Sequence, residues 1–168
     1  MKKITIALSI LMITACQQEK IGYVDNIKLM DAYQGKIDIA AKYEKKTAAL
    51  TQRRDSISQA FQIEAQDFQT KAQSMSQQKA QEAYAQMQQK GQMIGQQLQQ
   101  ADAQLQSQGQ AEMDSIVDRV KKEIKAYGKA NGYSYILGGG EGGSVLYGKD
   151  SHDLTDEIVK ILNANYEQ

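Results

Sequence analysis

The sequence contains no proline and no tryptophan, and it has a single cysteine and a single histidine. Proline would remove a backbone donor and break a helix, so its absence leaves long helices uninterrupted. One cysteine excludes a disulfide within the chain. His152, the only histidine, supports neither a histidine metal cluster nor a serine–histidine triad. We therefore expect no metal, no cofactor and no enzymatic activity.

An excess of positive charge is also missing. The 20 basic residues equal the 20 acidic ones, and loss of Lys2 and Lys3 with a leader peptide would leave 18 basic residues against 20 acidic ones. A protein that binds nucleic acid needs a more basic surface than this. We expect no nucleic-acid partner.

Residues 1–15 have the pattern of a bacterial export signal. Two lysines precede an apolar stretch, Ile4–Ile13, that is too short to span a bilayer. Ile13-Thr14-Ala15-Cys16 is similar to a lipoprotein cleavage box, in which the cysteine is acylated and becomes the mature N-terminus; the alternative is an ordinary signal followed by an unrelated cysteine. We predict a lipid anchor at Cys16 and a polar tether over residues 16–20. An aspartate directly after the cysteine would favour retention in the inner membrane. Because Gln17 stands there instead, we expect the protein to be anchored in the outer membrane and to face the periplasm.

Residues 26–131 show helical periodicity throughout. Apolar or small residues recur at heptad spacing at Tyr84, Met87, Gly91, Ile94, Leu98, Ala101 and Leu105. One straight helix would be about 160 Å long, so we expect a hairpin of two arms. An antiparallel register in which the numbers of paired residues add up to about 155 matches Ile37 with Val117, Leu50 with Leu105, Ile57 with Leu98, Phe61 with Ile94, and Phe68 with Met87.

This register places the tip near residues 75–78, where Ser74 and Ser76 could cap the returning helix. Asn26 is the expected N-cap of the first arm, which should then run without a break from about Ile27. Helical glycines at 91, 95 and 109 predict arms that bend.

The remaining segments, residues 21–25 and 132–168, form a small body. We predict strands at Ile21–Asp25, Tyr133–Leu137 and Ser144–Tyr147, and a helix at Thr155–Asn165 with an apolar stripe. The loop 138–143 matches G-x-G-x-x-G, but a strand follows it where a dinucleotide site needs a helix, so we interpret it as a hairpin loop. Three short strands cannot form a stable sheet alone, so several copies should share one core.

The arm surface carries the remaining signal for function, because residues 51–110 are rich in glutamine and alanine. One interpretation is a solvated helix surface. The other is a surface that accepts many partners weakly, with the pliant side chains of Met75, Met87 and Met93 as candidate contacts.

The order of elements resembles the Skp/OmpH family of periplasmic chaperones. The resemblance is carried by Ile21-Gly22-Tyr23-Val24-Asp25, by residues 130–137 (Ala-Asn-Gly-Tyr-Ser-Tyr-Ile-Leu) and by residues 153–159 (Asp-Leu-Thr-Asp-Glu-Ile-Val). It implies an α+β fold for residues 21–168, in which the long antiparallel helical hairpin projects from a small β-body shared between subunits, with a C-terminal helix. It also implies a homotrimer that holds unfolded outer-membrane proteins without ATP.

The chain departs from that pattern in its anchor and in its charge. The outer halves of the arms are nearly neutral, and basic residues gather toward the body at Lys42, Lys45, Lys46, Arg53, Arg54, Arg119, Lys121, Lys122, Lys125 and Lys129. The alternative function is a structural coiled-coil lipoprotein that acts as a spacer or tether between envelope layers.

Overall fold

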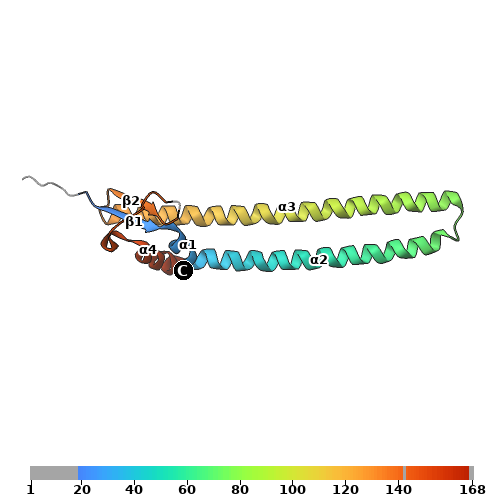
Figure 1. Ribbon diagram of the computed structural model, residues 1–168, viewed down its shortest axis with the longest axis horizontal. Coiled ribbons are helices and arrows are strands. Elements are labelled where there is room, and N and C mark those ends of the chain that lie inside the picture. Colours follow the sequence, from blue (N-terminus) through green and yellow to red (C-terminus); the bar gives the residue numbers. More distant parts are fainter. Residues whose placement is uncertain (1–18, 142, 167–168) are drawn as a thin grey trace, which may run out of the picture.

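The computed structural model describes residues 19–141 and 143–166. Two long helices, α2 (Gln34–Ala72) and α3 (Gln77–Ala130), run antiparallel from a small body, as Figure 1 shows. The body contains β1 (Ile21–Asp25), α1 (Asn26–Ala32), β2 (Tyr135–Gly139), a 3₁₀ turn (Asp150–His152) and α4 (Thr155–Tyr166). The predicted signal and the Cys16 anchor lie outside the described residues.

The first arm is interrupted at Tyr33, which contradicts the expected continuous helix. Tyr33 has extended backbone angles (φ −79°, ψ 114°) between α1 and α2. The break turns its fully buried ring into the core of the body. The predicted cap is also wrong by one residue, because Asp25 is the N-cap of α1: its Oδ1 accepts hydrogen bonds from the backbone N–H groups of Ile27 (3.0 Å) and Lys28 (3.1 Å).

The turn at the tip of the hairpin occupies residues 73–76, between the two arm helices. Ser76 is the N-cap residue of α3, but its side chain makes no capping hydrogen bond. The Ser74 hydroxyl instead donates to the carbonyl of Lys71 (2.9 Å), which closes the end of α2. The expected capping of α3 by these serine side chains is therefore wrong.

The sheet has two strands within the described part of the chain. β1 and β2 pair in parallel, from Ile21 opposite Tyr135 to Asp25 opposite Gly139. The whole hairpin forms the crossover that parallel strands require. The second predicted strand begins two residues later than expected. The third, Ser144–Tyr147, does not form, since Val145 makes only an isolated bridge to Gly139.

A tight turn after β2 explains the missing strand. Gly140 has φ of +87°, a conformation that favours glycine. The carbonyl of Gly138 then accepts from the N–H groups of both Ser144 (2.9 Å) and Val145 (3.2 Å), so the chain does not form an antiparallel ladder. The glycine-rich segment thus ends a strand and makes a turn, and the next α-helix begins only at Thr155.

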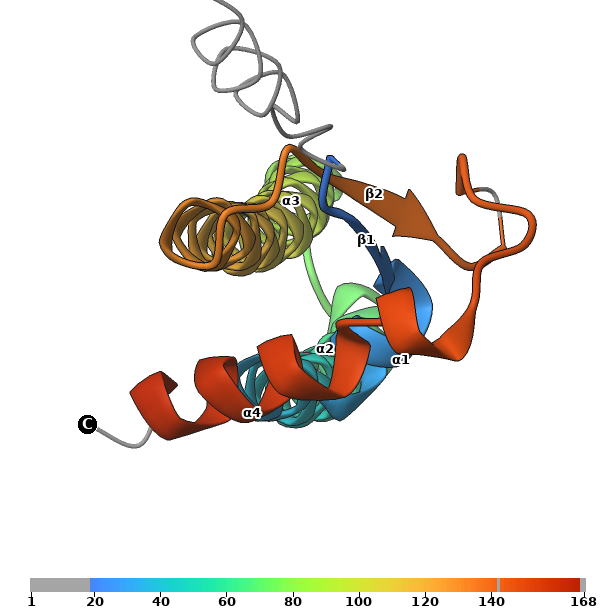
Figure 2. The same ribbon diagram turned by 90° about the vertical axis from the view of Figure 1, so that its left-hand side faces the viewer.

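Helix α4 closes the body, as predicted from its apolar stripe. Ile158 and Leu162 are buried and Ile161 and Tyr166 are half-buried. Figure 2 shows α4 lying across the body end of α2, with the two strands above α4 in this view. The hydrophobic core lies where these elements meet the end of α3, and it contains Val24, Leu29, Tyr33, Ile116, Val120, Leu154, Ile158 and Leu162.

Candidate functional site

The two arms contact each other along one seam, in the predicted antiparallel register. Three ion pairs cross it: Lys42 with Glu112 (2.7 Å), Arg54 with Asp102, and Lys90 with Glu64. Each pair lies within about one helical turn of the expected pairing. These charges are satisfied within the hairpin, which leaves the outer arms with even fewer free charges than the sequence indicated.

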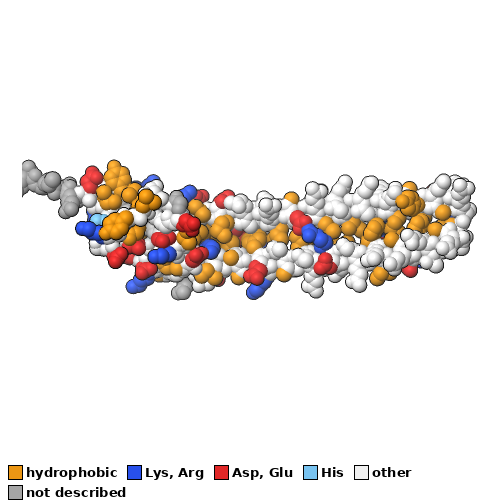
Figure 3. All heavy atoms as spheres, viewed as in Figure 1, with side chains coloured by type: hydrophobic (Ala, Val, Ile, Leu, Met, Phe, Trp, Pro, Cys, Tyr) orange, Lys and Arg blue, Asp and Glu red, His pale blue; other side chains and the backbone are white. Residues whose placement is uncertain are grey.

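The seam is only half-buried along most of its length. No residue between 36 and 115 is buried, although Met87, Leu98 and Leu105 are partly covered. Figure 3 shows the apolar side chains as a band between the two helices. Two predicted seam residues are exposed instead: Ile37 at 41% and Tyr84 at 57%, the latter with its ring centroid 6.4 Å from that of Phe68.

Two of the helical glycines accommodate aromatic rings from the opposite arm. A Cβ built on Gly91 would lie 3.1 Å from Cζ of Phe61, and one built on Gly109 would lie 3.2 Å from Cδ1 of Tyr43. Gly95 has no atom within 4 Å of such a Cβ. The predicted weak points at Gly91 and Gly109 therefore also have a packing role, which the sequence pattern alone did not reveal.

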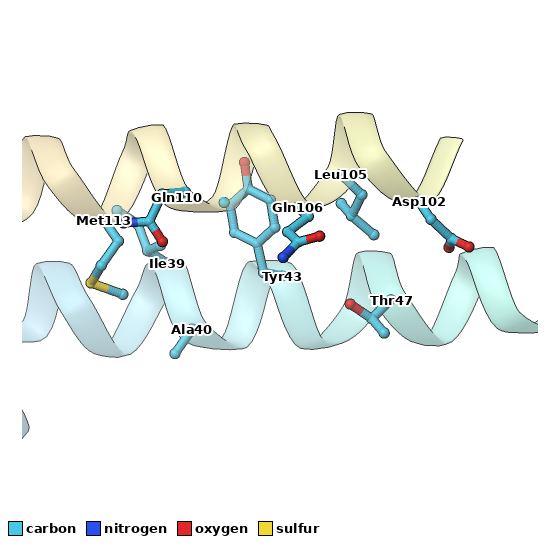
Figure 4. A pocket seen from close by; sticks show the side chains of 10 residues that line it. Ile39, Ala40, Tyr43, Thr47, Asp102, Leu105, Gln106, Gln110 and Met113 are labelled. Carbon is cyan, nitrogen blue, oxygen red and sulfur yellow. The ribbon is translucent and has the colours of Figure 1, made fainter. Parts of the chain in front are cut away.

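An apolar groove of about 490 Å³ opens between the arms near the body. Figure 4 shows the Tyr43 ring reaching from α2 toward α3 inside it. The lining residues come from both arms: Ile39, Ala40, Tyr43, Thr47, Asp102, Leu105, Gln106, Gly109, Gln110 and Met113. Residues 44–49 of α2 are all exposed, so the first arm contributes little to fill the seam here.

The Tyr43 hydroxyl is held at the edge of this groove by a charged pair. It donates to Oε1 of Glu112 (2.8 Å), whose two carboxylate oxygens also accept from Nζ of Lys42 at 2.7 Å. Hydrogen bonds from Lys42 and then Tyr43 lower the pKa of Glu112, while burial and the neighbouring carboxylate raise the pKa of Tyr43. The ring is thereby fixed in place as one wall of the groove.

The three predicted contact residues do not form one site. Met87 is half-buried in the seam, Met75 lies in the turn at the tip and is 38% exposed, and Met93 is 56% exposed on α3. Ile63, which is 54% exposed, was missed. It lies on α2 at the level of Met93, near the Glu64–Lys90 pair. The sequence did contain a signal for Ile63. Phe61 belongs to the predicted seam, and a residue two positions further along a helix points away from that seam.

The body has an exposed apolar patch of its own. Leu146 is 99% exposed and Tyr147 is 86% exposed, and they lie beside Ile21 and Leu137 around a groove of about 430 Å³. Tyr135 of β2 adds a further exposed ring. Patches of this kind on a small domain commonly mark a protein interface.

Neither metal chemistry nor membrane crossing is indicated by the described residues. No group of metal-ligating side chains comes together among them. None of their helices combines the length and apolar character that a membrane span requires.

Comparison with known proteins identifies the fold and then the family. A solved structure, a candidate OmpH-like outer membrane chaperone from Caulobacter crescentus CB15, superimposes with a TM-score of 0.78 at 15% sequence identity, over 88% of this chain and 85% of that one. At this identity the likeness shows the shared hairpin fold. A family model described as outer membrane protein (OmpH-like) matches residues 20–162, so the chain belongs to the OmpH-like family. A search of curated proteins found no match.

Proposed function

We propose that this protein is an ATP-independent chaperone of the cell envelope that holds unfolded outer-membrane proteins between its arms. The observation that carries the proposal is a hairpin of two long helices, without a buried residue between 36 and 115, that leaves apolar side chains accessible along its length. Membership of the OmpH-like family and the fold shared with a candidate chaperone support it.

Holding depends on many weak contacts made by several pairs of arms. An apolar groove and exposed side chains such as Ile63 and Met93 can each bind an unfolded chain only weakly. Several arms that act together can raise the apparent affinity by about 10² to 10⁴. The outer arms carry few charges of nearly balanced sign, and two cross-arm ion pairs neutralise some of these, so attraction between free charges contributes little.

The arms are brought together by trimerisation through the body. The exposed side chains of Leu146, Tyr147 and Leu137, beside a sheet of only two strands, are the surface through which the copies associate. Sedimentation of the purified protein should give about three chains per particle. A stable folded monomer would contradict this part of the proposal.

The lipid anchor at Cys16 places the chaperone on the membrane, with the outer membrane as the expected location. Two or more acyl chains on one cysteine are enough for stable anchoring. Cys16→Ser should therefore move the protein from the membrane fraction to the soluble periplasmic fraction. Unchanged retention would argue against acylation.

The decisive experiment measures whether the protein prevents aggregation of an unfolded β-barrel protein at one trimer per client. Replacing residues 62–93 with a short glycine–serine turn removes both arm tips in register and leaves the body intact. This variant should remain trimeric and lose holding. A protein that acts only as a spacer or tether would not delay aggregation in either form.

Salt dependence tests how the client is held. If apolar and amide contacts dominate, client affinity should change only modestly between low and high salt. Salt screens attraction between charges, over distances beyond about 8 Å at physiological ionic strength, and does not screen apolar contacts. A loss of about 100-fold at high salt would show that charge does the holding instead.

A further inference from the structure

A second groove, of about 450 Å³, lies on the body where the end of α3 meets β2. Its lining contains three lysines and no acidic residue: Lys121, Ile124, Lys125, Gly128, Lys129, Tyr133, Ser134 and Ile136. The lysines recur every four residues and so lie on one side of α3. Ile124, Ile136 and the buried Gly128 form an apolar floor, where a Cβ on Gly128 would lie 3.2 Å from Cδ1 of Ile136.

The positive charge of this groove is poorly compensated. Lys121 Nζ lies 3.9 Å from Oδ1 of Asp118, with side chains that are 72% and 79% exposed, so this pair contributes little. No ion pair in residues 19–141 or 143–166 involves Lys125 or Lys129. Three exposed ammonium groups beside an apolar floor suit a ligand with an anionic head attached to an apolar part.

The groove lies close to the start of the folded chain. Lys20 Nζ lies 4.1 Å from the ring centroid of Tyr133, which lines the groove, and donates to the carbonyl of Asn131 at 3.1 Å. Lys20 is four residues after Cys16, and an extended chain spans at most about 3.6 Å per residue. The Cα atoms of Cys16 and Lys20 are thus no more than about 14 Å apart. An acyl anchor at Cys16 would hold the groove beside the headgroups.

We propose that Lys121, Lys125 and Lys129 bind anionic phospholipid headgroups of the membrane that carries the anchor. This inference rests on the acylation of Cys16 in the proposed function. Lysines near an anionic membrane surface bind it through its negative potential. Figure 1 shows β1 beginning at the end of the body away from the arm tips, so headgroup binding there directs the arms away from the bilayer.

The test uses purified protein that lacks residues 1–16 and therefore has neither the apolar signal nor an acyl chain, so that vesicle binding reports the folded part of the chain. Co-sedimentation is measured with vesicles of phosphatidylcholine and with vesicles in which part of the lipid is phosphatidylglycerol. We expect binding only to the anionic vesicles. Replacing Lys121, Lys125 and Lys129 with glutamine should weaken it by about 100-fold, which corresponds to about 1 kcal/mol per lysine.

The matched control replaces Lys45, Lys71 and Lys79 of the arms with glutamine, which changes the net charge equally. This control should bind nearly as well as the parent, and replacing the three groove lysines with arginine should preserve binding. Equal losses in both glutamine variants, or equal binding to neutral vesicles, would overturn the proposal.

Two further readouts separate other occupants of the groove. If the glutamine variant of the groove had a different sedimentation coefficient from the parent, the groove would be a contact between copies of the chain. Lost client holding with unchanged vesicle binding would assign it to acidic segments of clients. Either result overturns headgroup binding. Because the vesicle assay needs no acylation, its outcome is independent of whether Cys16 anchors the protein in the cell.

Discussion

The body and the arms of this protein use one chain in opposite ways. In the body, Tyr33 and Ile158 are fully buried and Val24, Leu29 and Leu162 are 1% exposed. In the arms, residues 36–115 include no buried residue at all. The arms remain helical through the propensity of residues such as alanine and glutamine and through one half-buried seam. The buried core of the body holds its helices and strands in one arrangement, while the arms expose their side chains to solvent.

Polar groups show the same division. At the break between α1 and α2, Asn163 of α4 accepts from the N–H of Gln34 (2.9 Å) and donates to the carbonyl of Ala32 (3.1 Å). The Thr155 hydroxyl likewise accepts from the N–H of Asp25 at the end of β1 (2.9 Å). The cross-arm ion pairs, in contrast, join side chains that are roughly half exposed. Polar contacts in the body fix the direction of the backbone. The ion pairs between the arms favour one register of the two helices but contribute little to stability.

The largest expected contrast compares one apolar truncation in each region. Ile158→Ala removes a fully buried side chain and should lower the free energy of unfolding by about 2 to 5 kcal/mol. Leu98→Ala removes a half-buried seam residue and should cost about 1 kcal/mol. Denaturant unfolding at one fixed protein concentration measures both, since the assembly contributes to stability.

Circular dichroism would show whether the two regions unfold together. We expect Ile158→Ala to lose most of its helical signal in one transition at a lower denaturant concentration than the parent, because the arms depend on the body to align them. Similar destabilisation by both substitutions would contradict the difference between a buried core and an open seam.

The periodic parts of the fold could be predicted from the sequence. Heptad spacing from Met87 to Leu105 identified the seam, the antiparallel register was correct to within about one turn, and the stripe at Ile158 and Leu162 identified α4. The body was less predictable. Tyr33 breaks the helix because its ring is buried by α1 and α4, a tertiary effect that helical periodicity does not contain.

The missing third strand has a similar cause. Ser144–Tyr147 has the composition of a strand, but the turn at Gly140 directs it into a single bridge. The candidate site was predicted as a kind of surface, and its three named contacts, Met75, Met87 and Met93, lie apart in the structure. The groove at Tyr43 depends on Gly109 of the other arm, and only the pairing of the two helices reveals that neighbourhood.

Two glycines in the same helix sharpen the contrast within the arms. Gly95→Ala places a methyl group in open space and should stabilise the hairpin by about 1 kcal/mol through helix propensity. Gly91→Ala places it 3.1 Å from the Phe61 ring, which must shift, so most of that gain should be lost. Thermal unfolding of the two variants provides the comparison. Equal stabilisation would mean that Phe61 does not pack against Gly91.

The smallest expected effect concerns the ion pair beside the groove. The pKa of Glu112 is lowered from 4.5 in the folded protein, chiefly by the hydrogen bond from Lys42 and then by that from Tyr43. A carboxylate with a lowered folded pKa stabilises the fold above its unfolded pKa, and this stabilisation is lost as the pH falls through the folded value. The side chains of Lys42 and Glu112 are 48% and 36% exposed, so screening by solvent leaves the pair only a small contribution to stability. Glu112→Gln should therefore destabilise the hairpin slightly at neutral pH, and the difference from the parent should shrink to nothing well below pH 4.5.

Asp67→Asn, at an exposed position of α2, is the control and should change little at either pH. A difference for Glu112→Gln that grows as the pH falls would contradict the assigned direction of the pKa shift.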